Sequence, residues 1–117
     1  MLFRSNPTSL LAQKIVIHDQ RDHRDKAKDL LYMHDTVEVF SEILEELRHI
    51  FRKDIAPHLH PRRVAELEQA GDKLFGKVDD AIREGSLMAT GRTLSPERLA
   101  ETAQAGLKEI FGKEKKK

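Results

Sequence analysis

The residues of this chain that could do chemistry concentrate between Gln13 and Tyr32, a stretch that reads QKIVIHDQRDHRDKAKDLLY. Lys14 lies within an apolar run, a charged turn follows it, and Lys28 and Asp29 come after the turn. A lysine ammonium is a point charge suited to a phosphate group, and it can equally hold a carboxylate in an ion pair. The stretch therefore has the composition of half of a nucleotide-handling site, or of a structural ion pair between two helices.

A long apolar stripe predicts the element that would position this stretch. Seven apolar residues step by three and four without interruption: Leu30, Met33, Val37, Phe40, Leu44, Leu47 and Phe51. Their spacing predicts one helix from about Asp25 to Ile55. Asp29 lies four residues before Met33, so we expect its carboxylate near the buried edge of this helix. Because burying an unpaired charge is costly, the structural interpretation is that Asp29 pairs with Lys14 or Arg24.

Prolines and capping residues predict the remaining helices. Each of three segments begins with a cap residue followed by proline, namely Asn6-Pro7, His60-Pro61 and Ser95-Pro96. The β-branched run Ile15–Ile17 leaves a short strand as the alternative within the first segment. Pro57 is expected to end the long helix. The further helices are therefore predicted over about 7–18, 61–84 and 96–112, with the segment 85–94 ambiguous.

The composition agrees with an all-α fold. Of the 117 residues, 35% are charged and 38% hydrophobic, with no Trp, which is typical of solvated helices that each bury one narrow face. We expect a single helical domain over 1–112, a bundle of about four helices with one long central helix, and a disordered basic tail over 113–117.

Charge and cysteine content narrow the function classes. The formal net charge is +1, from 21 basic and 20 acidic residues, so no general polyanion-binding surface is indicated. The absence of cysteine excludes disulfides and thiolate metal sites and agrees with a cytoplasmic location. No apolar run approaches the roughly 20 residues that span a bilayer, and the start of the chain is too short and polar for a signal peptide, so no membrane association is expected.

Several short motifs together resemble a known family. They are Gln13-Lys14, Arg24–Tyr32, His34–Thr36, the elbow from Pro57 to Pro61, and Leu94–Glu97. In these motifs the chain resembles the C-terminal helical half of predicted nucleotidyltransferases of the AbiEii toxin-like group. Those proteins carry an N-terminal mixed α/β catalytic domain with a Gly-Ser turn and paired acids. The resemblance covers most of this chain, but only about the second half of such a protein.

The resemblance implies roles for five residues. Lys14 would correspond to the family's helix lysine, a point charge suited to a nucleotide phosphate. Asp29 would correspond to the acid of the family's Lys-Asp motif, and Arg21, Arg24 and Lys28 would form the basic turn beside it. The resemblance therefore implies a nucleotide- or phosphate-binding site over these positions.

The acids that nucleotidyl transfer requires are missing from the sequence. Transfer needs metal ions held by at least two closely spaced acids. The only Gly-Ser pair is Gly85-Ser86, and no Asp-x-Asp pair follows it at a useful distance. We therefore expect a non-catalytic module that supports nucleotide binding or association, with Mg²⁺ and nucleotide relevant only beside a catalytic partner domain. The expected partners are a second copy of the chain or a separate nucleotidyltransferase domain.

Other interpretations stay open. Arg52 and His58 match the arginine-to-histidine spacing of HEPN ribonucleases, which are also all-α, and the rival without chemistry is a plain oligomeric scaffold. No metal site is predicted, because His58 and His60 lack acids at fixed spacing and the pair Glu46 and His49 has no second copy. Nucleic-acid binding is less favoured, because no aromatic residues are interleaved among the basic ones.

Overall fold

The computed structural model describes residues 6–113, and within them every regular element is helical. The prediction of an all-α fold is confirmed, but the expected number of about four helices is wrong, since six α-helices form between residues 6 and 113. They are α1 (Pro7–Ile17), α2 (His23–Val39), α3 (Leu44–Ile50), α4 (Pro61–Phe75), α5 (Asp80–Leu87) and α6 (Pro96–Phe111). Short turns join them: η1 (His18–Gln20), η2 (Ser41–Ile43), the π-helical η3 (Phe51–Ile55) and η4 (Ala56–His58). Residues 114–117 of the predicted tail lie outside the described part of the chain.

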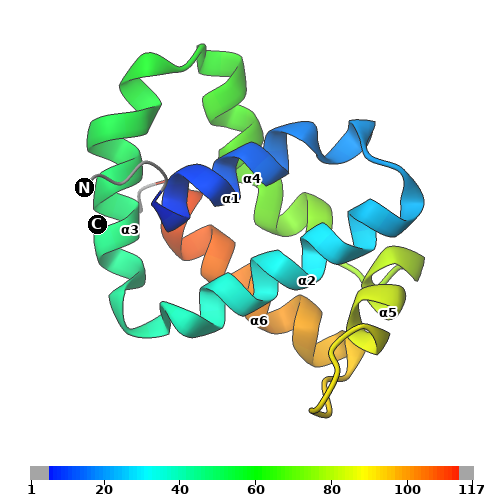
Figure 1. Ribbon diagram of the computed structural model, residues 1–117. Helices are drawn as coiled ribbons and strands as arrows, with labels where there is room; N and C mark the ends of the chain where they lie inside the picture. The colour runs from blue at the N-terminus through cyan, green and yellow to red at the C-terminus, as the bar shows by residue number, and fades with distance from the viewer. Residues whose placement is uncertain (1–5, 114–117) are drawn as a thin grey trace.

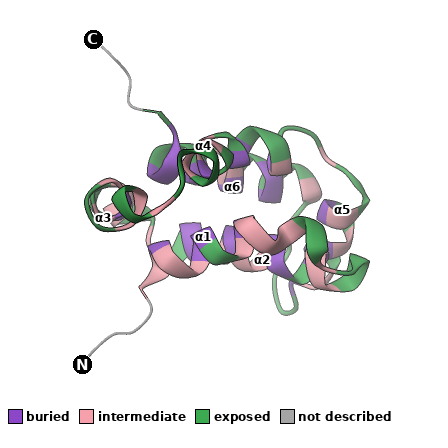
Figure 2. Cartoon of the chain, turned by 90° about the horizontal axis from the view of Figure 1, so that it is seen from above, coloured by how far each residue is buried: buried purple, intermediate pink, exposed green. Residues whose placement is uncertain are grey.

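The helices form two layers with a helix at each end. Figure 1 shows the chain path, and the view from above places α1 and α2 on one side and α4 and α6 on the other (Figure 2). Helix α3 closes one end of the two layers and α5 the other. One core cluster draws residues from all six helices, among them Leu11, Met33, Leu47, Phe75, Ile82 and Leu107. Within this cluster, the rings of Phe51 and Phe111 meet edge to face at 4.9 Å between centroids.

The long central helix predicted over 25–55 is interrupted. Helix α2 ends at Val39, where Phe40 leaves helical geometry at φ −105° and ψ 24°, and η2 turns the chain into α3. A straight helix of that length would measure about 46 Å, whereas the molecule extends 36 Å along its longest axis. The apolar stripe still continues across the break, because its residues are buried or half-buried on both sides of it. The periodicity therefore identified the buried face correctly but gave no sign of the change in direction.

The predicted helix starts are confirmed, and one predicted helix divides in two. Asn6 and Ser95 cap α1 and α6 by accepting backbone N–H groups from Ser9 and Arg98. The helix expected over 61–84 ends at Phe75, and a new helix begins after Asp79, whose carboxylate accepts the backbone N–H of Ile82 at 2.9 Å. Asp79 was the missed signal, an N-cap residue within an apparently continuous apolar pattern.

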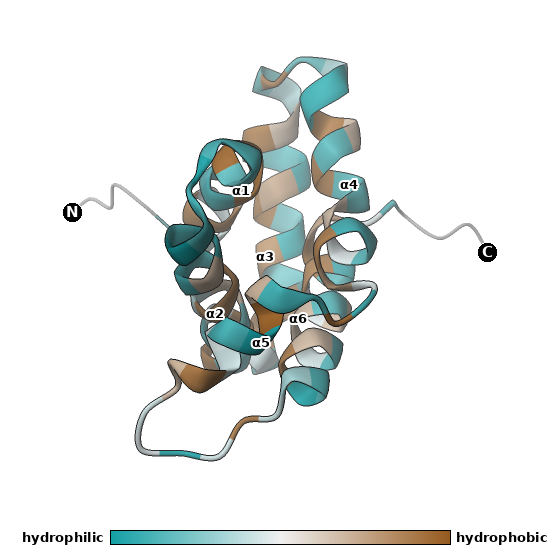
Figure 3. Cartoon of the chain, turned by 90° about the vertical axis from the view of Figure 1, so that its right-hand side faces the viewer, coloured by the Kyte–Doolittle hydropathy of each residue, from teal (hydrophilic) through white to brown (hydrophobic). Residues whose placement is uncertain are grey.

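Residues Pro7–Ile17 form a helix, so the alternative of a short strand over Ile15–Ile17 is wrong. Each helix shows both hydrophilic and hydrophobic stretches (Figure 3), as expected when one face packs on a core. Among residues 6–113, none of the helices combines the length and the apolarity needed to cross a bilayer.

Candidate functional site

A buried carboxylate lies at the centre of the stretch that the sequence singled out. Asp29 is 2% exposed, which confirms its predicted place at the buried edge of α2. One carboxylate oxygen, Oδ1, accepts from Lys14 Nζ at 3.2 Å and from Arg21 Nη2 at 3.4 Å. The other, Oδ2, accepts from Arg21 Nε at 2.8 Å. The carboxylate is therefore paired with two cations and has a hydrogen bond at each oxygen.

Three elements supply this cluster of Lys14, Arg21 and Asp29. The lysine comes from α1, the arginine follows η1 in an extended conformation, and the aspartate lies in the second turn of α2. The ammonium also lies over the ring of Tyr32, 5.2 Å from its centroid. The ion pair with Lys14 is thus present, but the arginine that joins it is Arg21 rather than Arg24.

The cations around Asp29 stay in contact with solvent. The side chains of Lys14 and Arg21 are 30% and 32% exposed, and hydrogen bonding to Asp29 raises the pKa of Arg21. Arg24 and Lys28 are exposed and lie four residues apart, so they share one face of α2. We call these four cations and Asp29 the α1–α2 basic face. It can attract an anion, while its carboxylate is occupied by its own neighbours.

Metal ligation has little support in the described part of the chain. Within residues 6–113, no three histidine or acidic side chains gather closely enough to hold a metal ion. Glu46, His49 and His58 are exposed. The remaining histidine of the elbow, His60, caps α4, since its Nδ1 accepts the backbone N–H of Arg62 at 3.0 Å.

Arg52 holds the end of α6 in place. Its guanidinium donates to the carbonyl oxygens of Gly112 at 2.7 Å and Phe111 at 3.4 Å, and to Glu68 Oε2 at 3.3 Å. These bonds satisfy carbonyls that the last turn of a helix leaves without partners. His58, the other member of the alternative ribonuclease pair, is exposed in η4. The guanidinium of that pair is thus already engaged in a structural role.

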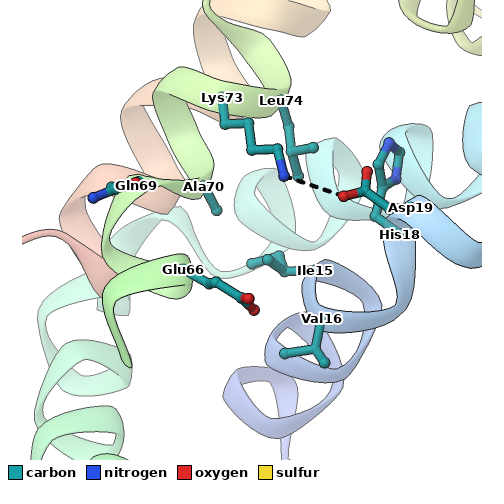
Figure 4. A pocket seen from close by; sticks show the side chains of 9 residues that line it. All are labelled: Ile15, Val16, His18, Asp19, Glu66, Gln69, Ala70, Lys73 and Leu74. Carbon is teal, nitrogen blue, oxygen red and sulfur yellow. Dashed lines mark hydrogen bonds and ion pairs between the residues drawn. The ribbon is translucent and has the colours of Figure 1, made fainter. Parts of the chain in front are cut away.

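A small cavity of about 130 Å³ lies between α1 and α4 (Figure 4). Ile15, Ala70 and Leu74 line it with apolar groups, and the ion pair between Lys73 and Asp19 crosses one side at 3.2 Å. This cavity could not be predicted from the sequence, because the residues that form it come from helices about 50 positions apart.

His18 borders this cavity and is predicted to make stability depend on pH. Burial lowers the pKa of His18 below its ordinary 6.5, and nearby Lys26 adds to the effect. At pH values between the His18 pKa of the folded chain and that of the unfolded chain, the unfolded chain binds more protons. The contribution of neutral His18 to the free energy of unfolding is therefore complete above pH 6.5 and is lost as the pH falls. Urea unfolding above and below that pH should show the loss. His18→Asn should reduce it, and an unchanged pH dependence in this variant would contradict the assignment.

A second polar cluster anchors the loop between α5 and α6 on α2. Both oxygens of Asp35 accept from Arg92 at 2.9 Å, and Oδ1 also lies 2.9 Å from His34 Nδ1. Burial opposes ionisation of Asp35, but these hydrogen bonds outweigh it and hold its pKa below the ordinary value. The cluster joins residues 57 positions apart, and sequence reasoning missed it.

The Gly-Ser pair of the sequence lies inside α5 and faces α2. A side chain at Gly85 would approach the carbonyl oxygen of Ala27 to 3.0 Å, and Ser86 is buried. Its hydroxyl donates to the carbonyl of Arg83 at 2.9 Å. This pair therefore serves helix packing.

The fold and this site define an all-α domain with a basic face built on a buried aspartate. No protein-family model, no curated protein and no solved structure matches this chain. The resemblance to nucleotidyltransferases of the AbiEii toxin-like group therefore stays a prediction.

Proposed function

We propose that this chain is a non-catalytic helical module whose α1–α2 basic face supports the phosphate groups of a nucleotide. The catalytic acids would come from a separate nucleotidyltransferase domain, with this module forming a wall of the shared site. The observation that carries the proposal is the pairing of one buried carboxylate, Asp29, with two partly exposed cations, Lys14 and Arg21.

The charges of this face favour an anion over a metal ion. Lys14 and Arg21 share the carboxylate of Asp29, and Arg21 also lies 4.0 Å from the carboxylate of Asp25, so the four cations of this face stand against two paired carboxylates. The exposed Arg24 and Lys28 add positive charge from a neighbouring side of α2. A carboxylate with both oxygens occupied by cations is a poor metal ligand, because the metal would have to displace them. Mg²⁺ would therefore reach this site with the nucleotide and the partner domain.

Binding of polyphosphate tests the proposal. Calorimetric titration with inorganic triphosphate and with ATP, both without Mg²⁺, is expected to show weak binding that falls as salt is added. The double variant Arg24→Ala/Lys28→Ala should weaken this binding by about fivefold or more, since each exposed charge near a phosphate is worth roughly 0.5–1 kcal/mol. Both side chains are exposed, so the fold should be unaffected.

The matched control is Lys77→Ala, which removes an exposed lysine between α4 and α5. It should leave polyphosphate binding unchanged. If Lys77→Ala lost as much affinity as Arg24→Ala/Lys28→Ala, the loss would reflect the net charge of the chain and not the α1–α2 basic face. The pure chain should also incorporate no labelled nucleotide. Robust incorporation that Asp29→Ala abolishes would overturn the non-catalytic assignment.

The second candidate function is a plain oligomeric scaffold, and one observation favours it. Val39, at the end of α2, is 74% exposed, which is unusual for a large aliphatic side chain. Exposed apolar groups of this kind often mark association surfaces. A HEPN-like ribonuclease is not proposed, because Arg52 is engaged with α6. RNA cleavage by the pure chain that disappears in His58→Ala would restore that alternative.

A further inference from the structure

A largely apolar hollow lies where α1, η4 and the start of α4 meet. It has a volume of about 420 Å³ and is lined mainly by aliphatic side chains: Leu10, Ala12, Val16, Ile55, Leu59 and Leu67. Four of these, all except Ala12 and Leu67, are only half-buried. The helices of the chain thus leave an apolar surface open to solvent here.

The rim of this hollow is basic. Arg63 lines it and Arg62 adjoins it, and both side chains are exposed. Arg63 pairs with Glu66 one turn later at 3.0 Å, whereas Arg62 forms no ion pair within the described residues. An occupant with an apolar side chain and acidic neighbours would match both the hollow and its rim.

The chain itself carries such a group. Val39 projects at the end of α2, 74% exposed, and acidic residues flank it on both sides, Glu38 before it and Glu42 after it. Neither glutamate forms an ion pair with any residue between 6 and 113. No basic residue occurs between Glu38 and Leu47 in the sequence. Arg92, which pairs with Asp35, lies near enough to Glu38 to interact with its charge. This corner therefore presents one apolar group among acids that form no ion pair.

The acidic corner and the basic hollow cannot meet within one molecule. Helix α3 runs from the corner after α2 to the elbow that precedes α4, so the two surfaces lie toward its opposite ends (Figure 1). We propose that Val39 of one copy docks into the α1–η4–α4 hollow of a second copy, with Glu38 and Glu42 facing Arg62 and Arg63. This proposal deepens the scaffold function and is independent of phosphate binding at the α1–α2 basic face.

Because the two docking surfaces differ, the contact is heterologous and each copy keeps one free surface. Association should therefore continue past the dimer as concentration rises. It should also weaken with added salt, because exposed charges contribute to the contact. A two-fold dimer would instead stop at two copies.

Sedimentation velocity over a range of protein concentrations tests the proposal. Val39→Lys should weaken self-association by about fivefold or more, since it replaces the apolar group and repels the basic rim. Arg62→Glu/Arg63→Glu should do the same from the other side. All three positions are exposed, so circular dichroism should show unchanged helix content. Leu87→Lys is the matched control, an equally exposed leucine outside both surfaces, and should have no effect.

Mixing the two weakened variants gives the decisive outcome. The hollow of Val39→Lys is intact, and so is the acidic corner of Arg62→Glu/Arg63→Glu, so one contact can still form. The mixture should assemble into a one-to-one complex and no further. A wild-type chain that stays monomeric at every concentration, equal weakening by Leu87→Lys, or a mixture without the complex would each overturn the proposal. Loss of polyphosphate binding in Arg24→Ala/Lys28→Ala does not bear on it.

Discussion

Gly106→Ala is expected to lower the free energy of unfolding by about 1–3 kcal/mol. Replacing glycine by alanine in the interior of a helix normally stabilises the folded state by about 1 kcal/mol. The loss of stability expected here is therefore opposite to what helix propensity alone predicts. The reason is the crossing of α6 and α2. A methyl group at this position would overlap both γ-methyls of Val37 and lie 2.9 Å from its Cβ. Because valine is β-branched and has one preferred rotamer in a helix, it cannot turn away.

A double-mutant cycle separates this overlap from other causes. Val37→Ala alone removes buried methyl groups and should destabilise the chain, but in its presence Gly106→Ala should cost far less. Urea unfolding of the four proteins gives the coupling. Additive effects of the two substitutions would show that α2 and α6 do not touch closely at Gly106 and Val37. The loss of stability in Gly106→Ala would then have another cause.

The sequence allowed the buried faces and the helix starts to be predicted, because both are local. An apolar residue every three or four positions must lie on one side of a helix, and a capping side chain bonds to a backbone only three residues away. The interruption of the long helix after Val39 does not depend on residues only a few positions apart. It follows from the size of the molecule, since an uninterrupted helix would extend beyond the core that its stripe must cover.

The difference between local patterns and long-range contacts also explains how much of the candidate site could be predicted. The burial of Asp29 could be predicted from the apolar stripe. The cost of an unpaired buried charge required a cationic partner, for which Lys14 and Arg24 were the two candidates. The resemblance implied a basic turn of Arg21, Arg24 and Lys28 beside Asp29. Which of these cations bonds to the carboxylate could not be predicted, because Arg21 lies in an extended turn where no periodicity sets its direction. The link between Asp35 and Arg92 depends on how α5 and α6 return to α2. Contacts of this range leave no pattern in a single sequence.

Asp29→Asn should change stability and anion binding in opposite directions. An amide cannot balance Lys14 and Arg21, so the folded state loses two charge-assisted interactions in a buried place. Removing one partner of a fully buried pair costs about 3–5 kcal/mol. Here the cations are about one-third exposed and can hydrate, so we expect a loss of about 1–3 kcal/mol, measured by urea unfolding.

The same substitution should strengthen polyphosphate binding, because it removes the negative charge that competes with the ligand for these cations. A several-fold gain in affinity for triphosphate without Mg²⁺, measured on a chain that is still folded, would support an anion-binding face with Asp29 as its structural counter-ion. A metal-binding acid predicts the reverse, a loss that is specific to the Mg²⁺ complex of the nucleotide. A purely structural ion pair predicts no binding before or after the change. The three assignments of Asp29 thus predict a gain, a loss or no change in polyphosphate affinity. Adding Arg24→Ala/Lys28→Ala to Asp29→Asn should remove the gain in affinity only if all the cations of the α1–α2 basic face bind the ligand together.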